Sequence, residues 1–538
     1  MSQLLPGLVK AWFITFLIVI LLLDTGVEAS VNLPLHHWTY ETIERLTALG
    51  IIDRAMVVTK PYSRKQAAKA VARALQRIRE DRMTDDDLRV VAEPLLDRLV
   101  REFRPELVDL GVLSSGPGTS PAGAVRFGGR LQTEVDGFQV GAGQVRLREN
   151  RGGEYYADGT QVQTDFRGWA EMADWAAFTV QPKFISNSHA LGAGATDNSH
   201  NLYMREFNLK LSAFNVAFEI GRGTQWWGPG YRGTLLLSDH AFPLDMIKLG
   251  SDEPFRLPGF LGSLGQWKIN TFLTRLERDR DFPRAEVFGL RISYMPTDWL
   301  ELGGTRLTQF DGRGHSGKTQ QFPSVIFDTY TNDTNQTGGK DVNEEAMVDF
   351  RVRVPSVPYL VPFPGGMQLY GELGMEDPPR DIAILAGAYI PQLFRGDTMD
   401  LRIEFADTDL QRTGNWYNNG LYTSGMRYRG YPLGHWMGTN AFDFYAGTTR
   451  YLTDGLQLGT HLDWSERNRQ LPVYERKFES GADLTWWMSN KAQFSIGYVY
   501  QRIHSPGEIT SINPFVESFP SNVASTNHFL WTSLAVQF

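Results

Sequence analysis

The chain contains no cysteine in its 538 residues, so no disulfide can stabilise it and closed strand pairing or a large core must do so. It also has no run of lysine or arginine, and its formal net charge of -8 argues against a nucleic-acid partner. No apolar run in the sequence reaches the about 20 residues that a membrane-spanning helix needs. Because the mean hydropathy is also below zero, the sequence excludes a helical bundle of the inner membrane.

The amino-terminal stretch has the features of a signal peptide. Lys10 precedes the apolar run from Ala11 to Leu23, and Val27-Glu28-Ala29 places small residues at a cleavage site. The alternative is an uncleaved membrane anchor, but the run is shorter than the about 20 residues that span a bilayer. The sequence therefore predicts a signal peptide over residues 1–29 and an exported protein. A β-barrel is then the remaining way to cross a membrane.

The last ten residues alternate between two faces. One parity is apolar and the other is small or polar: Leu530, Leu534, Val536 and Phe538 against Ser533, Ala535 and Gln537. This period of two predicts a strand with one apolar face. A final strand that ends on an aromatic residue is typical of bacterial outer-membrane barrels, where the last strand pairs with the first to close the sheet.

Residues 30–113 show helical rather than strand periodicity. Tyr40, Ile43, Leu46 and Leu49 share one helical face, and Gly50 follows as a stop signal. Ser63 and Gln66 form a capping box before a second helix, and a third is expected from Asp85 to Phe103, with Pro94 kinking or breaking it. We interpret residues 30–113 as a small periplasmic helical bundle, with a possible periplasmic or cell-envelope partner. The Gly- and Pro-rich residues 114–124 are its linker.

Residues 125–538 alternate between apolar and polar side chains in many short segments. Tight turns such as Pro296-Thr297-Asp298 and Thr453-Asp454-Gly455 alternate with long polar segments, and that distinguishes an outer-membrane barrel from a soluble sandwich. The pattern predicts an all-β transmembrane barrel of about 18 antiparallel strands, in contact with outer-membrane lipid and lipopolysaccharide. Aromatic residues near the strand ends are expected to form interfacial girdles: Trp299, Tyr451, Trp464, Trp486, Trp487, Tyr498 and Tyr500.

The same alternation places charges of both signs inside the barrel: Arg126, Arg130, Glu134, Asp165, Arg167, Asp349, Arg351 and Arg353. Unpaired charges in a narrow lumen would be costly, so we expect salt-bridge networks that fill it and leave little conductance. If the tight turns all lie on one side of the membrane, the chain must cross once more between Gly223 and Gly265, near Gly233–Ser238 or Met246–Gly250. The same condition also predicts one long outer loop from Asp407 to Asn440, and further outer loops at Asn187–Asn201, Asp311–Asn343 and Ser505–Asn527.

The segment from Gly221 to Pro243 is the most distinctive part of the sequence. Trp226 and Trp227 precede Gly228-Pro229-Gly230, with Tyr231 directly after this turn. Two adjacent tryptophans held by a Gly-Pro-Gly turn make a rigid aromatic platform, which could stack on a sugar ring or plug the lumen. On physical grounds alone, the plug is the more ordinary role.

These residues resemble the Wzi capsule-assembly family, which is marked by Trp-Trp-Gly-Pro-Gly followed by Ser-Leu-aliphatic-Leu-Ser and Asn-Ala-x-Pro. Trp226–Gly230, Leu235–Ser238 and Ala241-x-Pro243 match, whereas Thr234 and His240 stand where the family has Ser and Asn. The resemblance implies an outer-membrane barrel that acts as a lectin and attaches capsular polysaccharide, exopolysaccharide or O-antigen to the cell surface. In addition, Trp38–Ile52 with Ser63-Arg64 is similar to a surface-layer-homology repeat.

The predicted long loop contains further sugar-binding candidates. Trp416, Tyr417 and Asn418 lie in one segment and Arg429 and Tyr431 in another, so flat rings sit beside amide and guanidinium donors. Sugar C–H faces stack on rings, and sugar hydroxyls need such donors. Alanine at Trp416 and Tyr417 is therefore expected to reduce the polysaccharide retained by cells and to leave barrel assembly intact.

Two other classes of function stay open beside the lectin. A porin or polysaccharide-export channel would show the same alternation, but no constriction loop with opposed charges is recognisable. A hydrolase would need a nucleophile, base and orienter, and the adjacent Ser238-Asp239-His240 cannot form that chain in an extended segment. No acidic segment has the spacing of a calcium loop. We therefore expect no catalytic residues, no metal and no cofactor.

Overall fold

The computed structural model describes residues 29–79, 86–114, 125–139, 152–154, 159–172, 175–186, 202–315, 342–357, 359–376, 380–411, 414–469, 474–505 and 523–538. The predicted signal peptide up to residue 28, linker residues 115–124 and most of the outer loops predicted near residues 190, 325 and 515 lie outside this set. Within the described residues, no helix has the length and apolar character needed to span a membrane.

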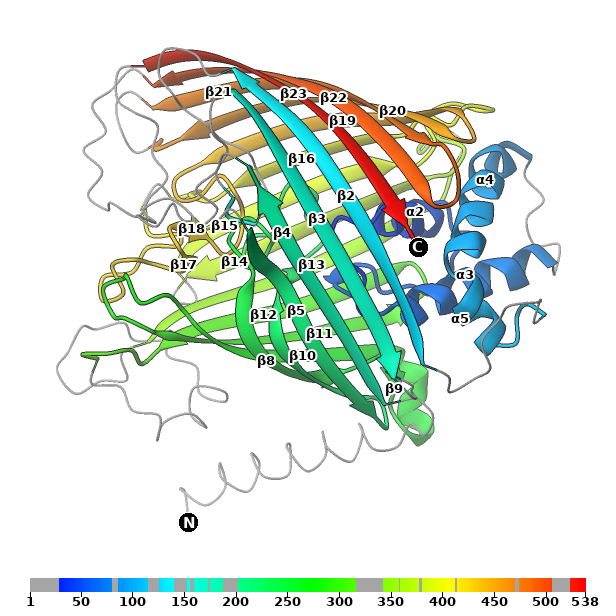
Figure 1. Ribbon diagram of the computed structural model, residues 1–538, viewed down its shortest axis with the longest axis horizontal. Helices are drawn as coiled ribbons and strands as arrows, with labels where there is room; N and C mark the ends of the chain where they lie inside the picture. The colour runs from blue at the N-terminus through cyan, green and yellow to red at the C-terminus, as the bar shows by residue number, and fades with distance from the viewer. Residues whose placement is uncertain are drawn as a thin grey trace.

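The main body is a closed antiparallel barrel (Figure 1), with eighteen crossings in the described part of the chain. The crossings are β2 Arg126–Gln139, β3 Gly159–Met172, β4 Ala176–Ile185, β5 Leu202–Ala213, β6 Val216–Gly223, β8 Leu244–Ser251 with β9 Phe255–Arg256, β10 Gln266–Arg275, β11 Glu286–Thr297, β12 Leu300–Phe310, β13 Asn343–Val354, β14 Met367–Glu376, β15 Arg380–Ile390, β16 Leu401–Asp407, β19 Phe442–Thr453, β20 Leu456–Arg467, β21 Glu475–Trp487, β22 Ala492–Ser505 and β23 Val523–Gln537. β2 pairs with β23 from Arg130↔Gln537 to Gln139↔His528, which closes the sheet as predicted.

The two faces of the barrel wall differ as the alternation predicts. Leu530, Leu534 and Phe538 are exposed on the outside, whereas Ser533 between them is buried toward the lumen. The same outward apolar face appears on β2, where Phe127 is 82% exposed. A closed sheet with an apolar outer surface satisfies every backbone group internally, and this is the architecture of a transmembrane barrel.

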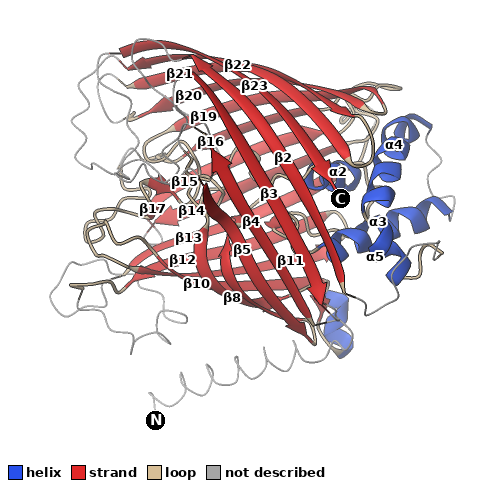
Figure 2. Ribbon diagram, in the orientation of Figure 1, coloured by secondary structure: helices blue, strands red, loops and turns tan. Residues whose placement is uncertain are grey.

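The barrel has one end with tight turns and one end with long connections. The predicted turns Pro296-Thr297-Asp298 and Thr453-Asp454-Gly455 lie at the same end as the helices, which we call the helix end (Figure 2). At the opposite end, which we call the loop end, one connection of residues 408–441 joins β16 to β19, and this confirms the predicted long loop. Of the two candidates for the extra crossing, Met246–Gly250 lies in β8, whereas Gly233–Ser238 is not a strand and lies inside the barrel.

The amino-terminal helices are α2 Thr39–Ala48, α3 Arg64–Arg79, α4 Asp86–Glu102 and α5 Arg104–Asp109, with a short strand β1 Thr59–Lys60 between α2 and α3. The predicted apolar face of α2 is buried, and Gly50 has a φ of 75°, the left-handed conformation that ends a helix. The backbone N–H of Gln66 donates to Ser63 Oγ at 3.1 Å, so the predicted cap of α3 forms.

Pro94 does not break the third helix. α4 runs continuously from Asp86 to Glu102 with Pro94 inside it, so of the two predicted effects, a kink or a break, the break does not occur. Proline removes one helical hydrogen bond, but the packing of its neighbours outweighs that loss: Val91, Leu95 and Leu99 are all buried against the other helices.

The helices are not separate from the barrel. α3, α4 and α5 lie across the helix end, and α2 lies within the outline of the barrel (Figure 1). Three ion pairs join the helices to the barrel: Arg45–Asp400 at 3.5 Å, Arg54–Asp298 at 2.7 Å, and Lys69–Glu253. The helical segment, whose helices pack around a core of their own, therefore plugs the helix end (Figure 1).

Candidate functional site

The Trp-Trp segment turns into the lumen instead of crossing the membrane. After β6, Trp226–Trp227 form the short strand β7, which pairs antiparallel with β1 of the helical segment, Lys60 opposite Trp226 and Thr59 opposite Trp227. The backbone N–H of Gly228 also donates to the carbonyl of Val58 at 3.2 Å. The least generic motif of the chain thus joins the barrel to its amino-terminal plug.

The two tryptophans have different surroundings. Trp227 is fully buried and its ring packs on Phe272 of β10, with 5.2 Å between ring centroids. Trp226 is 8% exposed, and its indole N–H donates to the carbonyl of Gly230 at 3.1 Å across the Gly-Pro-Gly turn. Trp227 is therefore a core residue, whereas Trp226 retains an edge that faces the lumen.

Two lumenal glutamates hold the turn that follows. Glu372 of β14 accepts hydrogen bonds from the backbone N–H groups of Gly230 at 3.0 Å and Leu235 at 2.7 Å. Glu404 of β16 accepts from those of Tyr231 at 2.6 Å and Arg232 at 2.8 Å. Each carboxyl group thus accepts two backbone hydrogen bonds, so the barrel wall fixes the backbone of the motif directly.

Gly228 is required by this arrangement. Its φ is 147°, and a Cβ there would lie 2.3 Å from Glu372 Oε1 and 3.0 Å from Thr234 Cβ. Any side chain would have to displace the carboxylate that binds Gly230 and Leu235. The glycine of the Trp-Trp-Gly-Pro-Gly pattern therefore has a steric cause in the lumen.

The long loop also folds into the lumen. It contains a small hairpin, β17 Arg427–Tyr428 and β18 Tyr431–Pro432, and the side chains of Trp416 and Tyr417 are only 1% and 0% exposed. The Tyr417 hydroxyl donates to the carbonyl of Leu235 and accepts from the N–H of His435 at 2.7 Å. Burial raises the pKa of Tyr417 far above its usual value. These rings join the Trp-Trp segment in one packed core.

The remaining predicted residues lie around this core. Tyr431 is buried, whereas Pro229, Tyr231, Asn418 and Arg429 are half-buried. Asn418 donates to the carbonyl of Gly414 at 2.7 Å, and the Arg429 guanidinium lies 4.2 Å from the ring centroid of Phe242. The structure thus brings the predicted residues together. Their burial favours the plug over the sugar platform for Trp227, Trp416, Tyr417 and Tyr431.

Charge pairs line the lumen, most of them between nearby strands, as the alternation predicts. Arg291 forms two hydrogen bonds to Asp349 at 2.8 and 3.0 Å, and Arg351 pairs with Glu301 at 3.1 Å. Further lumenal pairs are Arg167–Glu206, Lys210–Asp252, Lys248–Glu219, Arg232–Asp463 and Lys477–Asp463. The predicted filling of the lumen by salt bridges is confirmed for Arg126, Arg167, Asp349 and Arg351.

Two of the predicted girdle residues face inward instead. Trp299, Trp464, Trp486 and Tyr498 are exposed on the outside as expected. Tyr451 and Trp487 stack on each other at the helix end, where the guanidinium of Arg98 in α4 lies 3.8 Å from the Trp487 ring centroid. Adjacent strand residues point to opposite faces, so Trp486 and Trp487 cannot both face lipid.

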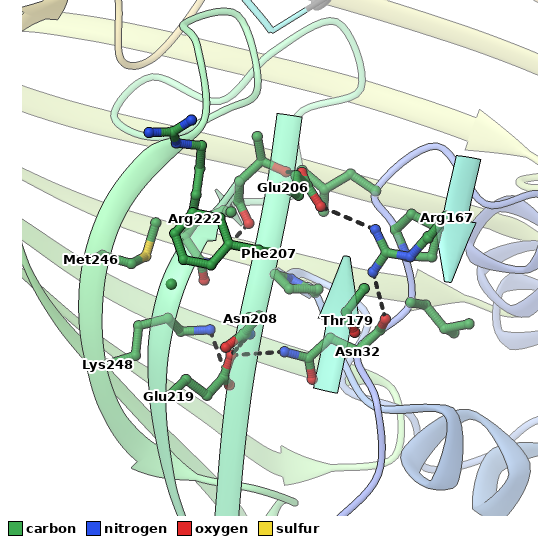
Figure 3. A pocket seen from close by; sticks show the side chains of 18 residues that line it. Asn32, Arg167, Thr179, Glu206, Phe207, Asn208, Glu219, Arg222, Met246 and Lys248 are labelled. Atoms are coloured by element: carbon green, nitrogen blue, oxygen red, sulfur yellow. Dashed lines mark hydrogen bonds and ion pairs between the residues drawn. The ribbon is translucent and has the colours of Figure 1, made fainter. Parts of the chain in front are cut away.

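A polar network ties the start of the described chain to the wall (Figure 3). Glu219 accepts from the Asn32 side chain at 3.0 Å and pairs with Lys248 at 3.2 Å. Arg167 pairs with Glu206 at 3.1 Å and donates to the carbonyl of Asn32 at 3.1 Å. The cavity that these residues line has only about 40 Å³, so it is part of the attachment of the plug.

Charged groups of the helical segment are also paired or shifted. Although burial raises the pKa of Glu102, the Arg64 guanidinium at 2.6 Å outweighs this and lowers that pKa to about 2. Burial lowers the pKa of Lys60, against the opposing effect of Glu44, and burial raises the pKa of Glu41. Both shifts favour the uncharged form of the side chain.

The Ser238-Asp239-His240 side chains each have their own contact. Ser238 Oγ donates to the carbonyl of Gly434, Asp239 pairs with His36, and the His240 ring meets the Tyr431 ring edge-on at 5.3 Å. The backbone N–H of His240 donates to Ser238 Oγ at 3.4 Å, which is not the side-chain relay that a hydrolase needs. In the described part of the protein, no group of three or more acidic or histidine side chains is arranged to hold a metal ion.

Because helices and loops fill both ends, the intact protein should conduct poorly. Barrels of 16–18 strands with an unobstructed lumen form aqueous channels, so we expect conductance roughly tenfold or more below theirs. Single-channel recording in planar bilayers, with an open porin of similar strand number as the control, measures this. Large, steady open-channel currents would contradict a plugged lumen.

Several residues of this site carry no recognisable sequence signal. Glu372 and Glu404 lie on the inward parity of their strands, so they could be expected in the lumen but not matched to the turn they hold. Thr59 and Lys60 lie in a short segment without periodicity, and their pairing with Trp226 and Trp227 spans more than 160 residues of sequence. Only the tertiary fold shows this contact.

Comparisons with known proteins agree with the fold and the motif. The family model described as "Capsule assembly protein Wzi" matches residues 133–508. A Klebsiella pneumoniae protein described as an uncharacterized 55.8 kDa protein in the cps region is 28% identical over 250 residues, covering 46% of this chain and 45% of that relative. The alignment thus spans less than half of the relative's length.

A solved structure matches over nearly the whole chain. It is Escherichia coli Wzi, described as an outer-membrane protein involved in group 1 capsule assembly and as a carbohydrate-binding β-barrel. The TM-score is 0.68 at 18% identity, and the match covers 95% of this chain and 100% of that one, which shows a shared fold. With the family model matching well over half of its residues, the chain belongs to the Wzi capsule-assembly family.

Proposed function

We propose that this protein is an outer-membrane lectin that attaches capsular or related extracellular polysaccharide to the cell surface, without covalent chemistry. The observation that carries the proposal is membership of the Wzi capsule-assembly family, given by the match of the family model. The matched residues include the Trp-Trp segment, which pairs with the plug inside the lumen. The E. coli member of known structure is described as carbohydrate-binding. Contacts with outer-membrane lipid and lipopolysaccharide, and an envelope partner for the helices, are further expectations of the same proposal.

Polar groups of the loop end are the best candidates for polymer contacts. Asn415 is exposed, and Asn418 and Arg429 are half-buried, in the same loop 408–441 as the buried rings. Amide and guanidinium groups supply the planar donors that sugar hydroxyls accept. In this proposal the buried rings act as scaffold, because they hold the donors in place. Many weak contacts along one polymer add up through multivalency.

The alternative of a porin or export channel has less support. Either function needs a continuous aqueous path, and among the described residues the loop 408–441 and the Trp-Trp segment pack together across the loop-end half of the lumen. An export channel could open only by moving this packed core out of the barrel. Burial of Trp227, Trp416 and Tyr417 makes that movement costly.

The test replaces the three donors Asn415, Asn418 and Arg429 with alanine together. We expect cells with this triple variant to retain at most about one third of the polysaccharide that wild-type cells retain. The reason is that each lost hydrogen bond weakens binding by about 0.5–1.5 kcal/mol. Retained and shed polymer are quantified in a deletion strain complemented with each variant. Heat-modifiable gel mobility reports whether the barrel is folded.

The matched control is a double alanine variant of Asn490 and Lys491, which are exposed polar residues in a turn at the helix end. This variant should retain polymer as the wild type does. Equal loss in both variants would point to a general assembly defect and count against the loop-end contact. If a complete deletion strain retains all its polymer, the lectin function itself is wrong.

A further inference from the structure

A cavity of about 560 Å³ lies inside the barrel, between the amino-terminal plug and the wall. One side is formed by residues 35–44 and 57–60 of the plug and by the turn after Trp226, and the other by β2 and β20–β23, with Arg351 of β13 and Arg402 of β16. The volume falls within the roughly 300–1,000 Å³ of pockets that hold small ligands. The other cavities associated with the plug are far smaller, at about 20–40 Å³.

Aromatic rings line this cavity from the plug, the motif and the wall. They are Trp38, Tyr40, Trp226, Tyr231, Trp487 and Trp531. Such rings offer flat apolar surfaces to the C–H faces of a pyranose, and the indole and phenol groups can also form hydrogen bonds. Trp226 presents here the edge that its contact with Gly230 leaves free.

The polar lining is mixed in sign. The Lys60 side chain forms no ion pair or hydrogen bond within the described structure, and its ammonium lies 5.4 and 5.8 Å from the ring centroids of Tyr40 and Trp226. Glu41 is exposed to the cavity although it lies inside the barrel, and Arg130 hydrogen-bonds only to Gln132 among described residues. Donors and acceptors together, with no dominant charge, suit hydroxyl groups better than an ion.

The cavity extends along the wall toward the helix end. Gln457, Trp487 and Gln493 line it, and each lies within two residues of a turn at that end. Toward the loop end, Arg232 pairs with Asp463 at 2.9 Å, and the ammonium of Lys477 lies 4.2 Å from the ring centroid of buried Trp436. A ligand in the cavity therefore meets a closed lumen above it.

We propose that this cavity is a second saccharide site, which binds a short, uncharged oligosaccharide segment. The proposal rests on the polysaccharide binding proposed above and adds an internal site to it. Rings from three separate parts of the fold would contact the sugar faces, and Lys60, Glu41 and Gln132 would contact its hydroxyls.

The test uses short oligosaccharides released by partial hydrolysis of the cells' own surface polysaccharide, titrated into the purified full-length protein. Ser533→Trp fills the cavity from β23, whereas Leu534→Trp adds the same side chain to the next residue, which faces lipid. We expect tenfold or weaker binding for Ser533→Trp and unchanged binding for Leu534→Trp, with both variants folded by gel mobility. Equal affinity for Ser533→Trp and the wild type would overturn the internal site.

A second measurement does not rely on filling the cavity with a large side chain. Because the chain has no cysteine, Ser495→Cys, also in the lining, is a unique thiol, and the oligosaccharides should slow its labelling by a small maleimide several-fold. Unchanged labelling at saturating oligosaccharide would contradict the site. Carboxyl-reduced oligosaccharides should bind at least as tightly as untreated ones, and loss of binding on reduction would refute an uncharged ligand.

The two proposals fail differently. A deletion strain that keeps its polymer contradicts the lectin function and, with it, the basis of the internal site. A deletion strain that sheds polymer, combined with full oligosaccharide binding by Ser533→Trp, contradicts only the internal site and leaves the loop-end proposal in place.

Discussion

Replacing Trp227 with alanine should destabilise the folded barrel by about 3–5 kcal/mol, the usual cost of truncating a buried tryptophan. Its side chain is 0% exposed, packs on Phe272 and belongs to a strand that pairs with β1 of the plug. The substitution therefore removes core packing and loosens the contact between wall and plug. Polymer retention should fall as a consequence. Denaturant titration followed by heat-modifiable gel mobility measures the stability.

Trp175→Ala is the matched control, because Trp175 is 60% exposed at the helix end. Its loss should shift the unfolding midpoint far less. Trp227→Phe should recover part of the stability, since a smaller ring still fills some of the space. If Trp227→Ala unfolds at the same denaturant concentration as wild type but still loses polymer, Trp227 would act in binding rather than in folding.

Replacing Asp349 with alanine should cost about 3–5 kcal/mol, because it leaves a buried arginine without its counter-charge. Arg291 is fully buried and its guanidinium donates to both oxygens of Asp349. The same guanidinium donates to Thr59 Oγ1 at 2.7 Å, so the pair also positions β1 of the plug. We expect Asp349→Ala to increase protease cleavage of the helical segment as well as to lower the unfolding midpoint.

The double variant Arg291→Met with Asp349→Leu should regain most of this loss, because an apolar pair removes the stranded charge. Glu286→Ala at the exposed end of β11 is the control. Its partner Arg275 is 61% exposed, and surface pairs contribute only about 0–1 kcal/mol. An equal midpoint shift for Asp349→Ala and Glu286→Ala would mean that the lumenal network does not stabilise the barrel.

The loop aromatics show where reasoning from composition stops. Trp416 and Tyr417 lie among amides in a long loop, and such a segment favours exposed rings that could stack on sugars. In the structure the loop returns into the barrel, where Trp416 packs on Gly374 of β14 and Tyr417 bonds to Leu235 and His435. Alanine at these positions should now act mainly through loss of packing, so intact assembly is no longer expected.

The sequence by itself determined the elements and their closure. Alternation along Phe529–Phe538 and along β2 assigns each side chain to lipid or lumen, and the 3.6-residue spacing of Tyr40, Ile43, Leu46 and Leu49 defines α2. Gly50 and Ser63 act within their own turns. These features depend on neighbours in the chain, which is why a single sequence is enough to predict them.

Only the tertiary structure decided what fills the lumen. The pairing of Thr59–Lys60 with Trp226–Trp227, the two glutamates that hold the following turn, and the inward fold of residues 408–441 each join segments far apart in the chain. A polar residue on the inward face of a strand has the same periodicity whether it meets water, a partner charge or a backbone N–H. Its role follows from which distant segment the closed barrel brings against it.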